Sequence, residues 1–301
     1  MMSSKKPALT LTLIITTSFF TAGGALGQPV IEATEELEFD APESWGMKYF
    51  ATLALLTSMG VPDRAPAGSI DLGFEGGFVP QLSEEQSRVG FDGTKIEDLN
   101  RTHFFGRVRG RIGLSESLGL ELAYLPPIEL NGTKPHMFAA GIGVPIDLAE
   151  SFRVGVRGYG QFGTIQGDIT CSAEEIESGP NPFDCLAPSN DEVTQRQFGV
   201  ELTAGYVSES PLRPYAGVAF NYLDLDFQVD AQHSGVIDHT LQKTNGGTVS
   251  LTGGVTYVAG ERWRFTGELF YSWLSVVRPP STSSQNDGLF NGRFLVSYRI
   301  R

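Results

Sequence analysis

Three arginines stand at alternate positions in one stretch of the sequence, at Arg107, Arg109 and Arg111. Alternate residues of an extended strand point to the same side, so the three guanidinium groups are expected to share one face. Guanidinium groups bind carboxylates through pairs of charge-assisted hydrogen bonds. The spacing therefore predicts a strand with a strongly basic face that lies beside water or beside acidic partners.

Charged residues also occupy the polar face of other alternating segments, and acids such as Asp71 and Glu75 supply partners for the arginines. In a dry core, each buried ion would carry a desolvation penalty of several kcal/mol. A hydrated lumen, crossed by ion pairs between arginine and glutamate, avoids that penalty. We expect this lumen to be lined by Arg107, Arg109, Arg111, Glu121, Arg153, Arg157, Glu201, Arg213, Arg264, Glu268 and Arg293.

Acids and histidines outside these segments raise the question of metal binding or catalysis. Asp224, Asp226 and Asp230 alternate but lack the spacing of an EF-hand loop, so we expect a solvated rim and no metal site. His103 and His136 are suited to act as bases, yet neither has a nucleophile two residues away on the same face. The sequence predicts neither a catalytic set nor a cofactor.

Ten segments with period-two alternation would position the charged side chains. No segment after the N-terminal leader reaches the roughly 18 uncharged apolar residues that a membrane helix needs. After Tyr222 the apolar set shifts by one residue to Leu223, Leu225 and Phe227, which a β-bulge or a strand extending above the membrane would explain. The segments are 69–78, 104–114, 118–124, 138–146, 152–162, 197–206, 212–222, 249–257, 263–271 and 290–300.

The connections between these segments alternate between tight and long. Tight connections fall at 115–117, 149–151, 208–211 and 259–261, and long ones at 84–101, 131–135, 168–191, 230–245 and 279–287. Cys171 and Cys185, the only cysteines, share one long connection, so we expect a disulfide formed in an oxidising compartment. Closing a loop of about fifteen residues is worth roughly 3 kcal/mol in the chain-entropy model.

By its strand pattern and loop asymmetry, the span 69–301 resembles the bacterial outer-membrane β-barrel proteins. The resemblance implies an all-β, closed antiparallel transmembrane barrel of about ten strands, with lipid outside and both termini in the periplasm. It also implies the outer membrane of a Gram-negative-type bacterium as location and the barrel assembly machinery as a partner. Such chains usually end in an aromatic residue, whereas this one ends in Ile300 and Arg301. A soluble sandwich or lipocalin-like barrel is the alternative.

Two segments precede the barrel. Residues 1–27 contain Lys5 and Lys6, an apolar run and a small residue at Gly27, which predicts a cleaved signal peptide. Its removal takes away two lysines and no acid, so the formal charge goes from -13 to -15. Residues 28–68 do not alternate, and Pro42 and Gly60 suggest the start and stop of a helix. That helix would lie at the periplasmic mouth, on the inner leaflet, or in the lumen as a plug.

These observations favour a non-enzymatic membrane barrel, porin-like in architecture, that acts as a narrow channel or transporter for a small solute or as a structural surface protein. About ten strands enclose too little space for a wide general porin. The alternative is a surface enzyme or ligand binder, such as an omptin-like protease using Asp238 and His239. The acidic charge excludes a nucleic-acid partner, because phosphate binding requires a basic face.

Overall fold

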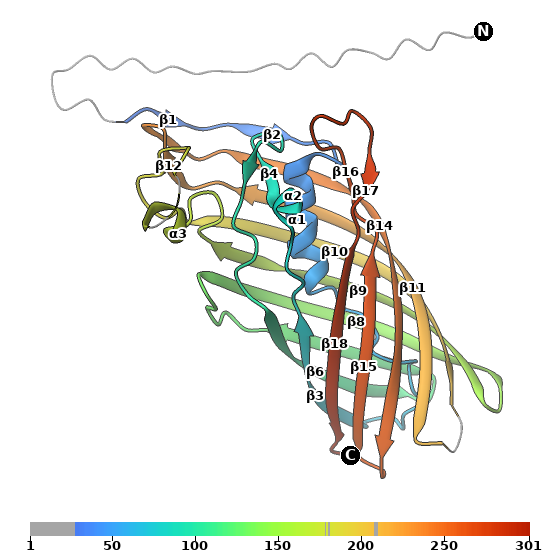
Figure 1. Cartoon of the computed structure of the whole chain (residues 1–301). Helices are drawn as coiled ribbons and strands as arrows, with labels where there is room; N and C mark the ends of the chain where they lie inside the picture. The colour runs from blue at the N-terminus through green and yellow to red at the C-terminus, as the bar shows by residue number, and fades with distance from the viewer. Residues whose placement is uncertain (1–27, 178, 180, 208–209) are drawn as a thin grey trace, which may run out of the picture.

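The alternating segments form ten long antiparallel strands that close into a barrel in the computed structural model (Figure 1), which describes residues 28–177, 179, 181–207 and 210–301. Neighbours around the barrel follow the order β11-β10-β9-β8-β7-β6-β3-β18-β15-β14, and β14 pairs with β11 to close it. The predicted fold class is therefore confirmed. The predicted signal peptide, 1–27, lies outside the described residues. The strands are β3 (Ile70–Phe78), β6 (Phe104–Ser115), β7 (Leu118–Leu125), β8 (Thr133–Ala149), β9 (Phe152–Gly167), β10 (Asp191–Tyr206), β11 (Leu212–Gln228), β14 (Leu241–Ala259), β15 (Trp263–Ser272) and β18 (Leu289–Arg299).

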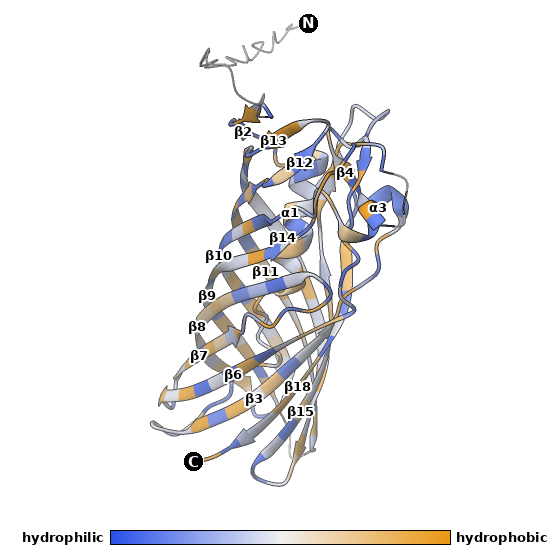
Figure 2. Ribbon diagram, turned by 90° about the vertical axis from the view of Figure 1, so that its left-hand side faces the viewer, coloured by the Kyte–Doolittle hydropathy of each residue, from blue (hydrophilic) through white to orange (hydrophobic). Residues whose placement is uncertain are grey.

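The barrel carries its large apolar side chains on the outside, opposite to the arrangement of a water-soluble protein. Phe104 and Phe198 are 62% and 64% exposed, whereas Glu75 and Glu201 on the inner face are buried. Figure 2 shows the resulting alternation of hydrophobic and hydrophilic residues along the strands. A closed sheet pairs the strands on both sides, which a bilayer core demands because it offers no water to unpaired backbone groups.

The connections fall into two classes that mark the two ends of the barrel. Short turns join β6 to β7, β8 to β9 and β14 to β15 at the short-turn end, and extended loops occupy the long-loop end. The predicted disulfide between Cys171 and Cys185 is confirmed in the loop between β9 and β10. The loops carry α2 (Glu84–Ser87), β4 (Arg88–Gly90), β5 (Lys95–Ile96), α3 (Ala173–Glu177), β12 (Ala231–His233), β13 (Val236–Asp238), β16 (Ser275–Val276) and β17 (Gln285–Asn286).

Strand β11 explains the shift in the apolar pattern after Tyr222. It pairs continuously with β10 from Tyr215 to Gln228, so the bulge explanation is wrong. Leu223 and Leu225 stay on the inner face and are buried against a helix in the lumen. Asp224 and Asp226 stay on the outer face, where each lies 3.2 Å from Arg196. The inner face therefore becomes apolar because a helix packs on it.

That helix, α1 (Pro42–Leu53), belongs to a chain segment that passes through the barrel (Figure 1). Upstream of it, at the long-loop end, β1 (Val30–Ile31) pairs with β13, and β2 (Thr34–Glu36) runs parallel to the start of β14. Downstream, the Gly68 amide donates to the Gly113 carbonyl at 2.7 Å, at the short-turn end. Of the placements that the sequence left open for the helix in residues 28–68, the lumen is the one observed.

This path corrects two expectations. Both termini were expected at the periplasmic end, but Gln28 lies at the long-loop end and Arg301 at the short-turn end, because the N-terminal segment adds one more passage to the ten strands. The helix was expected to continue to Gly60, but it ends at Leu53. None of the helices among the described residues is long and apolar enough to cross a membrane.

The disulfide yields a first prediction. Replacing Cys171 and Cys185 by serine frees the ends of the loop between β9 and β10, while the strand ladders remain intact. We expect limited proteolysis to cut this loop at least several-fold faster in the variant and in reduced wild-type protein. The heat-modifiable gel mobility of the folded barrel should stay unchanged. Equal cleavage of oxidised and reduced protein would contradict this expectation.

Candidate functional site

The site is the contact between the barrel wall and the plug, which we define as residues 42–68: helix α1 and the extended segment that follows it. Outside helices and sheets, a chain has carbonyl groups that need other partners. In the plug, the carbonyls of Thr52 and Leu53 accept hydrogen bonds from Arg293 at 3.2 and 3.0 Å. The helix ends here because barrel side chains bind the carbonyls that a further helical turn would use.

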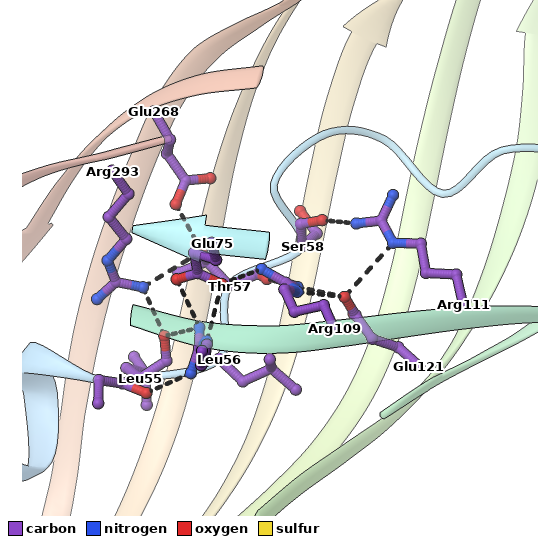
Figure 3. Close-up of polar contacts among 12 residues, drawn as sticks. Leu55, Leu56, Thr57, Ser58, Glu75, Arg109, Arg111, Glu121, Glu268 and Arg293 are labelled. Carbon is purple, nitrogen blue, oxygen red and sulfur yellow. Dashed lines mark hydrogen bonds and ion pairs between the residues drawn. The ribbon is translucent and has the colours of Figure 1, made fainter. Parts of the chain in front are cut away.

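Five inward-facing arginines bind the next carbonyls in sequence, and Figure 3 labels three of them, Arg109, Arg111 and Arg293. The Ala54 carbonyl accepts from Arg107 at 2.7 Å and the Leu55 carbonyl from Arg293 at 2.5 Å. The Leu56 carbonyl accepts from Arg157 at 2.5 Å. The Thr57 carbonyl accepts from Arg109 at 2.6 Å, and the Ser58 carbonyl accepts from Arg111. We call Arg107, Arg109, Arg111, Arg157 and Arg293 the arginine clamp, since together they bind every carbonyl from residue 52 to residue 58.

Four buried glutamates lie beside the clamp: three pair with its arginines, and two, Glu201 and Glu268, also contact the plug. Glu75 lies 2.8 Å from Arg107 and 2.6 Å from Arg109. Glu121 lies 2.8 Å from Arg157 and also pairs with Arg109 and Arg111. Glu201 is 2.9 Å from Arg157 and accepts from the Ser58 amide at 3.2 Å. Glu268 accepts from the Thr57 hydroxyl at 2.5 Å and from the Tyr215 hydroxyl at 2.8 Å.

A second set of charges binds the plug nearer the short-turn end. Asp63 of the plug pairs with Arg153 at 3.5 Å, with Arg213 at 3.7 Å and with Arg264. Arg64 pairs with Asp147 at 2.7 Å. The eleven side chains expected to line the lumen thus converge on the plug or on its partners. They surround a peptide, so the expectation of a hydrated passage along them needs correction.

Small residues on the inner face make room for the plug. A Cβ added at Gly155 of β9 would lie 2.2 Å from the Pro62 side chain, and one at Gly205 of β10 would lie 2.4 Å from Val61. Contacts this short are sterically forbidden, so a larger residue at either position would displace the plug or deform the wall.

The empty space left by the plug differs between the two halves of the barrel. Near the short-turn end, cavities of about 60 and 30 Å³ remain, enough for a few water molecules. Towards the long-loop end lies an outer cavity of about 230 Å³, with Met47 and Phe50 of α1 and acids such as Glu43 and Asp92 in its lining. A wall cavity of about 490 Å³ lies against another side of α1.

The histidines and acids considered for catalysis lie in the loops and at strand ends. His239 is 3.3 Å from Asp230, and both are exposed. Asp238 contacts His233 at 3.3 Å. His103 contacts Gln81 at 3.0 Å. In the part of the chain that the structure describes, no histidine lies in one cleft with two carboxylates within hydrogen-bond reach, and no group of three or more ligating side chains is placed to hold a metal ion.

Known proteins resemble this chain in overall fold and not in sequence. No protein-family model and no curated protein matches the sequence. Similar solved structures include the translocator domain of the autotransporter NalP from Neisseria meningitidis, with a TM-score of 0.40, 10% identity and coverage of 79% of this chain and 90% of that one. The outer membrane protease OmpT from Escherichia coli gives a TM-score of 0.36, 12% identity and coverage of 77% and 92%. Ail from Yersinia pestis gives 0.28, 10%, 78% and 99%.

The architecture of this chain is therefore identified from its own strand pairing and from its apolar outer surface. A closed barrel of ten antiparallel strands, apolar outside and charged inside, with long loops at one end and short turns at the other, is the architecture of bacterial outer-membrane β-barrel proteins. The predicted resemblance is confirmed at this level.

The arginine clamp predicts a large stability effect at one position. Arg293→Met removes four hydrogen bonds to the plug and a positive charge that acts on the buried Glu268, which should lower the free energy of unfolding by about 3 to 5 kcal/mol. The matched control is Arg196→Met, which removes two surface ion pairs, each worth about 0 to 1 kcal/mol. Urea unfolding in detergent micelles, followed by tryptophan fluorescence, measures both. Equal shifts in the two variants would contradict a structural role for the clamp.

Proposed function

We propose that this chain is an integral outer-membrane protein that its own N-terminal segment holds closed, and that it acts as a narrow carrier for a small solute. The arginine clamp is the observation that carries the proposal, because it attaches the plug to the wall through the carbonyls of residues 52–58. Outer-membrane lipid and the barrel assembly machinery are the partners that accompany this proposal.

The distribution of space inside the barrel supports a carrier over a permanently open channel. The cavities near the short-turn end have room for only a few waters, whereas the outer and wall cavities of about 230 and 490 Å³ are of the order of small-molecule sites. A solute would thus bind in the outer half of the barrel and would pass further only when the plug moves. A non-catalytic role stays our prediction, and no observed geometry favours the surface-enzyme alternative enough to propose it.

Removing the plug tests this proposal directly. We expect the full chain, purified and inserted in a planar bilayer, to show no steady ion conductance, because the plug fills the half of the lumen near the short-turn end. A variant lacking residues 28–67 should conduct once heat-modifiable gel mobility has shown that it folds. Steady conductance of the full chain would contradict closure. A folded deletion variant that does not conduct would contradict the plug as the barrier.

A milder change keeps the plug in the chain but fills the space that the plug occupies beside two glycines of the wall. The double variant G155V/G205V places side chains where Pro62 and Val61 now lie. We therefore expect the plug to leave the half of the lumen near the short-turn end, and the protein to show intermittent conductance. The matched control is G158V/G253V on strands β9 and β14, where an added Cβ meets no atom within 4 Å among the described residues. Equal conductance of both double variants would contradict the steric role assigned to these glycines.

A further inference from the structure

The wall cavity crosses the barrel wall instead of lying wholly inside it. Part of its lining comes from the outer face, where Phe104 and Val108 are 62% and 51% exposed. The rest comes from the lumen, where Tyr49 and Leu53 of α1 and Met137 of β8 are buried. In an intact sheet, successive side chains on opposite faces are separated by the backbone layer. A cavity lined by both outward-facing and lumen-facing residues therefore indicates a gap in the backbone layer.

The strand pairing locates the gap between β6 and β8. Strand β6 pairs with β3 as far as Phe104, but its ladder with β7 begins only at Val108. Strand β8 pairs with β9 as far as Thr133, but its ladder with β7 begins only at Met137. Strand β7 stops at Leu125 because Pro126 and Pro127, which lack backbone N–H groups, follow it. Along residues 104–107 of β6 and 133–136 of β8, the wall therefore consists of side chains and of the loop that joins β7 to β8.

The chemistry of the lining indicates what enters this gap. Nearly all the lining side chains are apolar, and exposed Ile128 and Leu130 of the loop continue the apolar outer surface up to the opening. Arg101, the charged residue in the lining, is already neutralised by Asp98 and Asp168 at 2.9 and 2.8 Å. A ligand that arrives from the hydrocarbon of the bilayer therefore stays in apolar surroundings along the whole path.

One residue that lines the cavity carries a hydroxyl without a hydrogen-bond partner among the described residues. Tyr49 is fully buried, and its hydroxyl has no hydrogen-bond partner among the described residues. An unsatisfied buried hydroxyl costs about 1 to 3 kcal/mol in proteins, which makes it an unusual feature at a helix position that a phenylalanine would fill. A neutral phenol donates one hydrogen bond, so the missing partner is an acceptor such as a carbonyl or carboxyl oxygen.

We infer that the wall cavity binds a single-chain aliphatic molecule with one hydrogen-bond acceptor, of the fatty acid or fatty ester type, which enters sideways from the outer leaflet of the membrane. The inference rests on the proposed function, since it names the solute class that the carrier takes up. The acyl chain occupies the gap between β6 and β8, and the acceptor group bonds to the Tyr49 hydroxyl. The volume of about 490 Å³ accommodates one such chain.

Photolabelling tests the lateral path. The full chain, reconstituted in phosphatidylcholine liposomes, is irradiated with a palmitic acid that bears a diazirine in its chain, and adducts are mapped by mass spectrometry. We expect adducts on the α1 peptide that contains Tyr49 and Leu53, which lie beyond the reach of a probe that stays outside the wall. Adducts confined to outward-facing residues would overturn the inference.

Two matched pairs sharpen the test. Val108→Trp places a large ring at the opening and should reduce α1 labelling at least five-fold, whereas Val218→Trp, also outward-facing but on β11, should leave it unchanged. Tyr49→Phe removes a hydroxyl without a partner, so the barrel should fold normally. Labelling of the remaining α1 residues by the diazirine acid should fall, while labelling by a diazirine alkane stays the same.

The outcomes separate this inference from the proposed function. Equal α1 labelling in the two tryptophan variants would overturn the lateral path, and equal labelling by the acid in wild type and Tyr49→Phe would overturn the role of the hydroxyl. Neither result bears on ion conductance. Steady conductance of the full chain would instead overturn closure by the plug, whether or not α1 is labelled.

Discussion

A peptide that passes through a β-barrel without joining its sheet must still find partners for its carbonyl groups. Here the barrel provides them from side chains, since the arginine clamp binds the carbonyls of residues 52–58 and the glutamates hold the clamp in place. The cost of burying charged groups is offset because each arginine meets both a carboxylate and a carbonyl, or several carbonyls. The position of the plug, the end of α1 and the small size of the cavities near the short-turn end all follow from this arrangement.

The sequence predicted the barrel well because period-two alternation is a local property of each strand. All ten expected segments correspond to barrel strands, and the disulfide followed from two cysteines in one loop. The inward direction of the eleven charged residues could be predicted for the same reason. Their partner could not, because a carbonyl group belongs to every residue and leaves no signature in the sequence of the plug.

Other features depend on contacts between segments that lie far apart in the chain. The helix was expected to end at Gly60, where the local stop signals are, but Arg293 ends it at Leu53 from more than two hundred residues away. The apolar inner face of β11 suggested a bulge until α1 was seen to pack on Leu223 and Leu225. The Pro126-Pro127 pair was a readable signal for an interrupted strand, yet only the pairing of β6 and β8 shows the gap that it leaves.

The threaded N-terminal segment also constrains the order in which the molecule is put together. The first and last strands of the barrel, β3 and β18, meet along one line of hydrogen bonds, and that line completes the ring. A chain that enters the ring at one end and leaves it at the other must be enclosed before these strands join, or be drawn through lengthwise afterwards. Folding of this barrel thus includes either enclosing residues 42–68 within the growing sheet or drawing them through the closed ring, a step that an empty barrel does not need.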